Sequence, residues 1–269
     1  MQIGIMVRNM GPASQPAIIE ACARHAEEVG IHSLWVCDHI AIPAEDSEGS
    51  GGRYLDPLAT LAFLAGVTRR ISLGVTVLIV PYRPALPTAK WVATVQELSQ
   101  GRLQLGVGVG WMAAEFRALG INRARRGVVT DETLAFLNDC FADDEVELNG
   151  QRFLFLPRPL KPPVLVGGLG PHCFERIVRY GDGWMPMGSE PAKLAVAITE
   201  LRTRMASAGR PVPQVIPLGC LALDDHRKAH AQLDEWAALG ATGFIHAARY
   251  ATSDEFKRMT ERLMHAQLA

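Results

Sequence analysis

Short apolar runs alternate along the chain with longer segments in which apolar residues recur at helical spacing. Continuous apolar runs are typical of parallel strands that are buried on both faces. Eight strand–helix units in succession predict an α/β fold of the closed (β/α)8 barrel type, with residues 1–269 forming one domain. The alternative is an open, doubly wound sheet divided near Gly150. The eight runs span residues 3–7, 33–37, 71–80, 103–111, 163–166, 183–187, 215–223 and 243–247.

Local signals mark the ends of some of these elements. Asp56-Pro57 supplies a cap and a first-turn proline for a helix that follows the second strand. Residues 145–155 alternate in polarity around Asn149-Gly150, which is a strong hairpin signal. Because this hairpin interrupts the strand–helix alternation, we predict it as an insertion between the fourth and fifth barrel strands.

Three glycines lie on one face of the fourth predicted strand. Gly106, Gly108 and Gly110 alternate with apolar residues, and a strand normally avoids glycine because it packs nothing and costs backbone entropy. The pattern predicts that something comes very close to the backbone there. A flat or bulky ligand and a tightly packed helix are the two interpretations.

Composition narrows the class of protein. The chain has 269 residues, 48% of them hydrophobic, and a formal net charge of −1, which gives no reason to expect a nucleic-acid partner. The N-terminal segment lacks a basic leader, and no apolar run reaches the length of a membrane span. These two features predict a cytoplasmic protein with no membrane partner. Scattered cysteines without a Cys-x-x-Cys pair predict a reduced, intracellular chain with no zinc site. They are Cys22, Cys37, Cys140, Cys173 and Cys220.

In a barrel of this type the active face lies at the carboxyl ends of the strands. The residues expected there are rich in glycine and apolar side chains, with few potential metal ligands and no Ser or Cys next to an obvious base. Such a mouth suits a planar organic cofactor better than hydrolysis. The residues are Arg8, Asn9, Asp38, His39, 77–81, 108–111, 167–170, 185–189 and His246.

Two glycine-rich turns are candidates for binding phosphate. The segment Gly167-Gly168-Leu169-Gly170 can direct backbone N–H groups toward an anion, although an ordinary tight turn has the same composition. The segment from Gly108 to Ala113 fits a loose dinucleotide fingerprint. Its ribose-binding acid would fall at Asp131 or Glu132, inside a helical pattern, so a dinucleotide site is disfavoured.

Histidine and tryptophan supply the remaining candidates. His39 is either a proton- or hydride-site residue or a ring that caps a strand end, and His246 is a weaker candidate of the same kind. Trp35 and Trp91 are interpreted as core residues. Trp111, at the mouth, is either a cofactor contact or a core residue.

Several motifs, in order, cover nearly the whole chain and make it resemble the luciferase-like monooxygenase superfamily. Within that superfamily it is most similar to the compact branch of oxidoreductases that depend on the deazaflavin coenzyme F420. The motifs are Ser33-Leu-Trp-Val-Cys-Asp-His39, Leu73-Gly-Val-Thr-Val-Leu78, Gly101-Arg-Leu-Gln-Leu-Gly-Val-Gly-Val-Gly-Trp111 followed by Glu115-Phe116, Pro163-Val-Leu-Val-Gly-Gly168 and Tyr180-Gly-Asp-Gly-Trp184.

The resemblance implies a barrel, often a homodimer, that holds a flavin or deazaflavin in its mouth. It implies a non-proline cis peptide at Thr76–Val77, in a bulge behind the ring. Asp38 and His39 match positions beside the ring, Val109 and Gly110 match positions that line the cofactor, and the loop from Gly167 to Gly170 matches the phosphate site. Trp111 occupies the position at which the sugar-phosphate dehydrogenases of the family have a glutamate that acts as the acid. Oxidation of glucose-6-phosphate is therefore not expected.

The function that the resemblance implies is hydride transfer between F420 and a small organic substrate, with His39 supplying or relaying a proton. The alternative is an FMN-dependent monooxygenase that uses O2 and receives reduced flavin from a partner reductase. A third interpretation is a flavin-binding barrel without catalysis. The loop at residues 45–54 and the hairpin at residues 145–155 are expected to shape the substrate pocket.

Overall fold

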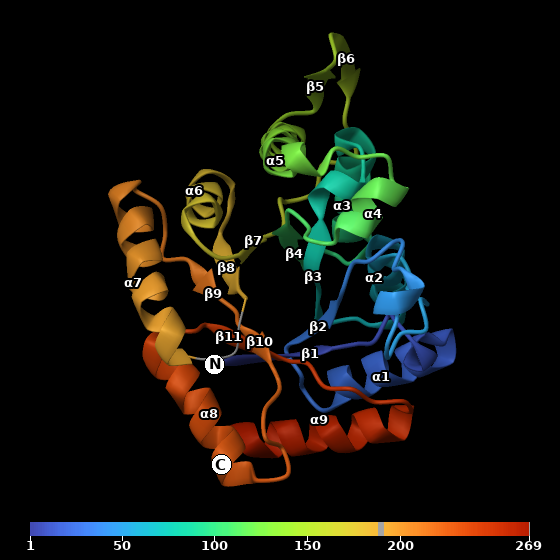
Figure 1. Cartoon of the computed structure of the whole chain (residues 1–269), viewed down its shortest axis with the longest axis vertical. Coiled ribbons are helices and arrows are strands. Elements are labelled where there is room, and N and C mark those ends of the chain that lie inside the picture. The colour runs from blue at the N-terminus through green and yellow to red at the C-terminus, as the bar shows by residue number, and fades with distance from the viewer. Residues whose placement is uncertain (188–190, 269) are drawn as a thin grey trace.

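A computed structural model of the chain describes residues 1–187 and 191–268. Nine parallel strands form one sheet in the order β10-β11-β1-β2-β3-β4-β7-β8-β9, which curves around a central axis (Figure 1). Gly188 and Ser189, predicted at the mouth, lie outside the described residues. The strands are β1 (Gln2–Met6), β2 (Ser33–Val36), β3 (Ser72–Ile79), β4 (Leu103–Gly108), β7 (Val164–Gly168), β8 (Gly183–Pro186), β9 (Gln214–Val215), β10 (Leu218–Gly219) and β11 (Gly243–His246).

The seventh barrel strand is broken into two short pieces. β9 pairs with β8 and β10 pairs with β11, and only Ile216 and Pro217 separate the two pieces. Proline has no N–H to give to a ladder, which accounts for the interruption. Counted as one strand, β9 and β10 join the two ends of the sheet and give eight barrel strands. The predicted (β/α)8 barrel is therefore confirmed, although the seventh strand is shorter than its apolar run suggested.

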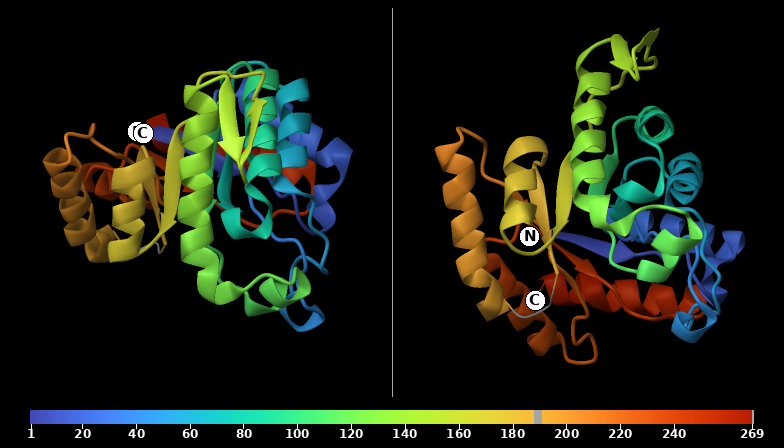
Figure 2. Two further views of the ribbon diagram at one scale, coloured as in Figure 1. Left: turned by 90° about the horizontal axis from the view of Figure 1, so that it is seen from above. Right: turned by 45° about the horizontal axis from the view of Figure 1, so that its top comes forward.

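Helices surround the strands on the outside (Figure 2). The Asp56 carboxylate accepts hydrogen bonds from the N–H groups of Leu58 and Ala59, so the predicted cap is confirmed. Within the described residues, no helix is both long and apolar enough to cross a membrane. The helices are α1 (Pro16–Glu28), α2 (Pro57–Val67), α3 (Ala85–Leu98), α4 (Ala113–Ala118), α5 (Arg126–Ala142), α6 (Pro171–Tyr180), α7 (Pro191–Ser207), α8 (His226–Leu239) and α9 (Ser253–Leu268), with short 3₁₀ turns η1 (Pro12–Ser14), η2 (Ala44–Asp46), η3 (Val80–Tyr82) and η4 (Arg123–Arg125).

The predicted hairpin is present between the fourth and fifth barrel strands. β5 (Glu145–Leu148) and β6 (Gln151–Leu154) pair antiparallel around Asn149 and Gly150, whose φ angles are 52° and 77°. Two positive φ angles are what a tight two-residue hairpin turn requires. The hairpin projects beyond the helices next to α5 (Figure 1), so it extends the molecule away from the barrel.

The barrel interior is filled by apolar side chains from the strands themselves. Trp35 is fully buried there, as predicted, in a cluster with five other buried apolar side chains. The prediction for Trp91 was wrong, because its side chain is 44% exposed on the outer surface of α3. The partners of Trp35 are Met6, Leu165, Met185, Ile216 and Ile245.

The glycine face of β4 is packed closely by side chains of the protein itself. A Cβ atom on Gly106 would lie 2.8 Å from Met185 Sδ, and one on Gly108 would lie 2.5 Å from Val77 Cγ2. Side chains of neighbouring strands occupy this face at Gly106 and Gly108, whereas a Cβ atom on Gly110 would lie 3.1 Å from the ring of Phe116 in α4. The predicted close approach is therefore confirmed, and a helix takes part in it at Gly110 only, because the spacing reports a close approach without showing what approaches.

The expected cis peptide is confirmed at Thr76–Val77. The pairing of β3 with β4 shifts register between Val75 and Leu78, so the bulge of β3 lies at the same place. A Cβ atom on Gly167 would be 2.8 Å from Val77 Cγ1, just as one on Gly108 would touch Val77 Cγ2. The glycines of β4 and β7 therefore leave room for the side chain of the bulge.

Candidate functional site

A buried carboxylate holds His39 at the carboxyl end of β2. Glu115, in α4, is fully buried, and its Oε2 lies 2.9 Å from Nδ1 of His39. The same oxygen accepts a hydrogen bond of 2.8 Å from the Tyr82 hydroxyl. The other oxygen, Oε1, accepts from the backbone N–H groups of Ile40 (2.6 Å) and Ala41 (2.9 Å). Glu115 thus fixes both the ring of His39 and the chain that follows it.

These contacts determine the charge of Glu115. Burial alone raises the pKa of this carboxyl, but the hydrogen bonds from Ala41, Ile40, His39 and Tyr82 outweigh it, and the pKa lies below its usual value. An ionised carboxylate can only accept, so Nδ1 of His39 carries the shared proton. Nε2 then faces away from Glu115 and has no hydrogen-bond partner among the described residues, which leaves it available to a ligand.

Two aromatic rings flank His39. Its ring centroid lies 5.1 Å from that of Tyr54 and 6.3 Å from that of Trp111, both in edge-to-face orientations. Trp111 is 65% exposed, so it is a surface residue at the mouth and not part of the core. The interpretation of His39 as a backbone-satisfied strand cap does not fit, since its ring is held by a side chain from another element.

Asp38 is tied to the protein on both of its oxygens. Arg83 forms a bidentate pair with it, with Nη1–Oδ2 and Nη2–Oδ1 distances of 2.7 Å and 2.9 Å. Ile79 donates its backbone N–H to Oδ2, and Arg83 also reaches Asp56 at 2.7 Å. Asp38 is buried, and its contacts join the ends of β2 and β3 directly beside His39.

The two mouth residues that follow β1 also form hydrogen bonds to other segments of the protein. The Asn9 amide donates to the carbonyl oxygens of Cys37 and Leu55, at 2.8 Å and 2.9 Å. Arg8 donates its backbone N–H to the Tyr250 hydroxyl and its guanidinium to the Gly49 carbonyl. These contacts fasten the loops around the mouth.

A cavity of about 550 Å³ lies beside the ends of β4 and β7. It brings together four of the predicted cofactor residues, Val109, Gly167, Gly168 and Leu169, but His39 is not among its lining residues. Gly170 caps the N-terminus of α6 with a φ of 82°. The first turn of this ten-residue helix therefore begins at the glycine loop, where backbone N–H groups favour an anion.

The cavity carries positive charge. Arg126, Arg176 and Arg179 line it together with Asp131 and Glu175, and Arg176 is paired with Asp131 at 2.7 Å. Arg126 makes no ion pair with the described residues, and its buried Nε has no hydrogen-bond partner among them. An orphaned guanidinium N–H beside a glycine loop fits an oxyanion such as a phosphate.

The site also contains charged and aromatic residues that were not predicted from the sequence. Glu115 was visible only as part of a motif, although a glutamate on the apolar side of a short helix is itself a signal. Tyr54, Tyr82, Arg83 and Arg126 gave no such signal, since their contacts join segments far apart in the sequence.

A sequence profile described as luciferase-like monooxygenase matches residues 1–268. The chain belongs to the luciferase-like monooxygenase family. It is therefore an oxidoreductase, as the motifs implied. Its similarity to Rv0953c, an uncharacterized protein of Mycobacterium tuberculosis, is 30% identity over 289 residues, covering 98% of this chain and 97% of the relative.

Solved structures with the luciferase-like fold agree with the barrel. The monooxygenase RslO1 from Streptomyces bottropensis superposes with a TM-score of 0.84 at 21% identity, covering 100% of this chain and 99% of that one. An F420-dependent secondary alcohol dehydrogenase, in complex with an F420–acetone adduct, gives 0.81 at 16% identity, covering 98% of each chain. At these identities the similarity establishes the fold.

Proposed function

We propose that this luciferase-like protein is an F420-dependent oxidoreductase that transfers a hydride between the deazaflavin and an electron-poor C=C, C=N or C=O bond of a small organic substrate. The observation that carries the proposal is the pair of His39 and Glu115, which leaves Nε2 of His39 free at the mouth of the barrel. The F420-dependent alcohol dehydrogenase of the same fold supports the choice of cofactor.

The residues of this chain fit such a cofactor in two places. The loop from Gly167 to Gly170 and Arg126 would hold its phosphate, because they combine backbone N–H groups with a guanidinium that makes no ion pair with the described residues and whose Nε lacks a hydrogen-bond partner among them. Val109 and Trp111, at and after the end of β4, would lie along the ring system, with Thr76, Val77 and Gly110 behind it. When bound, the deazaflavin supplies the hydride, which is the difficult part of the chemistry.

His39 would supply the proton that accompanies the hydride. Reduction of a C=O bond places negative charge on oxygen, and a proton from Nε2 of His39 neutralises it. Glu115 keeps the opposite nitrogen protonated and stabilises the positive ring that donates. In the reverse direction, Nε2 accepts the proton of an alcohol while the hydride leaves its carbon. Asp38 would be a positioning residue, because its ion pair with Arg83 fixes the chain at the end of β2, next to His39.

A run of arginines next to the cavity favours F420 over FMN. Arg123, Arg125 and Arg126 lie within four residues in η4 and at the start of α5, and Arg126 lines the cavity. FMN ends at its phosphate, whereas F420 continues into a chain of glutamate carboxylates. Arg125 pairs with Glu132 at 3.7 Å but stays exposed, and cations beyond the phosphate site suit a cofactor that extends past its phosphate.

The deciding experiment is a titration of the apo protein with F420 and with FMN, followed by tryptophan quenching. Trp111 is the expected reporter, and Trp111→Phe provides the matched control. Anaerobic oxidation of reduced F420 in the presence of carbonyl and imine substrates, set against oxygen consumption with reduced FMN, then separates the two chemistries. Tight binding of FMN with oxygen uptake, and none of F420, would make the protein a flavin monooxygenase instead.

The proposal includes a cytoplasmic homodimer that receives reduced cofactor from a separate F420 or flavin reductase. An exposed apolar strip supports the dimer. Trp91 and Leu98 are exposed on α3, and the segment with exposed Leu156 and Leu160 lies along the same helix. Lys90 and Gln96 of α3 hold that segment by hydrogen bonds of 2.7 Å and 2.8 Å to the carbonyl oxygens of Leu156 and Leu160.

A further inference from the structure

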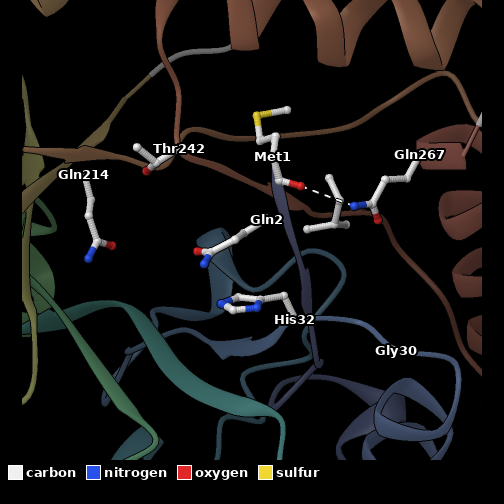
Figure 3. A pocket seen from close by; sticks show the side chains of 8 residues that line it. Met1, Gln2, Gly30, His32, Gln214, Thr242 and Gln267 are labelled. Carbon is white, nitrogen blue, oxygen red and sulfur yellow. Dashed lines mark hydrogen bonds between the residues drawn. The ribbon is translucent and has the colours of Figure 1, made fainter.

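A second polar cavity, of about 320 Å³, lies at the carboxyl end of the last two barrel strands. The loop after β10, the end of β11 and the first half of α9 enclose it, and it shares no lining residue with the cavity beside Gly168. A larger hollow of about 620 Å³ at the opposite, amino-terminal end of the strands is lined by amides and His32 (Figure 3). It has no cationic side chain among its lining residues.

His246, which lines the cavity at the end of β11, has an unused hydrogen-bond donor. Its side chain is only 1% exposed. Nδ1 accepts a hydrogen bond of 3.2 Å from the backbone N–H of Leu221, so the ring proton is on Nε2. Burial lowers the pKa of His246 to about 4, which keeps the ring neutral near pH 7. Nε2 is buried and has no partner among the described residues.

The ring of His246 faces the helical layer and not the barrel axis. Phe244, two residues earlier on the same strand face, packs against Trp236 of α8, whereas Ile245 belongs to the barrel interior. The orphaned Nε2–H therefore lies among the loops and helices outside the barrel strands. An orphaned buried donor costs free energy unless an acceptor reaches it.

The remaining walls of the cavity carry a positive balance. Three arginines and two acids line it, which is a formal balance of +1. Asp224 pairs with Arg262 at 2.6 Å, and Glu255 accepts the backbone N–H of Ala251 at 2.7 Å. Arg249 and Arg258 make no ion pair with the described residues, so two guanidinium groups remain for a ligand.

We propose that this cavity binds the oxyanion group of a small organic phosphate or carboxylate, with Nε2–H of His246 and the guanidinium of Arg258 as donors. The location supports it, since barrels of this fold frequently bind phosphate between the loops that follow strands seven and eight. The volume exceeds that of a single oxyanion, which leaves room for the organic part of the ligand. The site is independent of the cofactor proposed above.

The test uses the full-length protein labelled with ¹⁵N, observed through the side-chain ¹H–¹⁵N signal of His246. Sodium phosphate and sodium acetate are titrated separately at constant ionic strength maintained with NaCl. A saturable shift of the His246 signal is expected with at least one of them. The tighter of the two anions identifies the group as phosphoryl or carboxylate.

Three variants make the result specific. Arg258→Gln should weaken the anion about tenfold or more, the loss of one charge-assisted hydrogen bond. Arg227→Gln, on the exposed surface of α8, should leave the affinity unchanged. Arg126→Gln weakens any binding of phosphate in the cavity beside Gly168. It should leave the His246 shift intact, because the two cavities are separate sites. Failure of the cofactor proposal would not alter these expectations.

Several outcomes would overturn the inference. One is a His246 signal that responds to NaCl as it does to phosphate and acetate. Another is equal weakening by the Arg258 and Arg227 substitutions. A third is a signal that does not respond to either anion, which would mean that Nε2 donates to an ordered water molecule only.

Discussion

The Nδ1 atom of His39 and the Oε2 atom of Glu115 lie 2.9 Å apart, and they come from the end of β2 and from α4. Because Glu115 is buried and receives four hydrogen bonds, this contact has a fixed geometry. Nδ1 of the imidazole is bound to the protein, and Nε2 is left to contact a ligand in the mouth of the barrel. The pair converts a solvent-accessible histidine into an oriented proton donor and acceptor.

Replacing Glu115 by Gln tests this orientation. The amide keeps the shape but cannot accept from all four donors or stabilise a positive ring. We expect kcat for oxidation of reduced F420 to fall by about 10- to 100-fold, the scale of a lost supporting contact, while KM changes little. Steady-state kinetics measure it, and Tyr82→Phe, which removes only one donor, should have the smaller effect. Equal kcat values in Glu115→Gln and the wild type would contradict the assigned role.

Replacing His39 by Asn removes the proposed proton donor. The turnover rate should fall by roughly 10²- to 10⁴-fold, because general acid catalysis contributes on that scale. Cofactor affinity should change far less, since the phosphate loop and Arg126 are untouched. Stopped-flow oxidation of reduced F420 and equilibrium titration separate the two quantities. If the variant binds the cofactor and turns over normally, His39 is a structural residue.

Glu115 also makes the stability of the fold depend on pH. Its pKa is lowered in the folded protein, so it contributes stability above the ordinary glutamate pKa, and this contribution is lost as pH falls through the lowered value. Urea unfolding followed from pH 7 to pH 3 should show a smaller acid destabilisation in Glu115→Gln than in the wild type. Parallel curves for the two proteins would show that another carboxylate controls acid unfolding.

The close packing of Val77 on Gly108 can be measured by a double-mutant cycle. A Cβ atom at Gly108 would meet Val77 Cγ2 at 2.5 Å, so Gly108→Ala should cost about 1–3 kcal/mol of unfolding free energy through overpacking. Val77→Ala opens the space, and the double variant should recover part of that loss. Additive effects in urea unfolding would show that the two side chains do not compete for the same volume.

The arginine run gives a prediction that separates the cofactors. Arg123→Gln combined with Arg125→Gln should weaken F420 by several-fold and leave FMN affinity unchanged, because only F420 carries carboxylates beyond its phosphate. Arg126→Gln should weaken both. The difference should shrink with added salt, since exposed charges are screened. An equal effect of the double substitution on both cofactors would remove the argument for F420.

The apolar strip on α3 predicts a homodimer in solution. Trp91→Asp and Leu98→Asp place charge in the proposed interface, and light scattering should report a change from dimer to monomer at micromolar concentration. Val196→Asp, at an exposed position on α7, is the matched control and should not change the mass. A monomeric wild type would refute the dimer.

Much of the architecture can be predicted from the sequence. The barrel strands are apolar runs, and the turn at Asn149-Gly150 and the helix start at Asp56-Pro57 depend on the residues present at those positions. The tertiary contacts do not follow in the same way. Nothing near Gly108 in the sequence shows that Val77 fills the space beside it, and helical spacing does not show that Trp91 faces outward. Glu115 reaches His39 across 76 positions of sequence, a distance over which no local pattern acts.

The broken seventh strand gives the barrel wall a seam. Each of its two pieces is two residues long and forms a ladder with one neighbour, and the Thr242 N–H bond to the Val215 carbonyl links β9 to the chain before β11, so the paired segments there are shorter than elsewhere in the barrel. Local opening requires the least free energy where the ladder is shortest. Deuterium should therefore enter the amides of Leu218 and Ile245 before those of β3 and β4. The seam also adjoins the cavity of His246, so an anion bound there should slow that exchange.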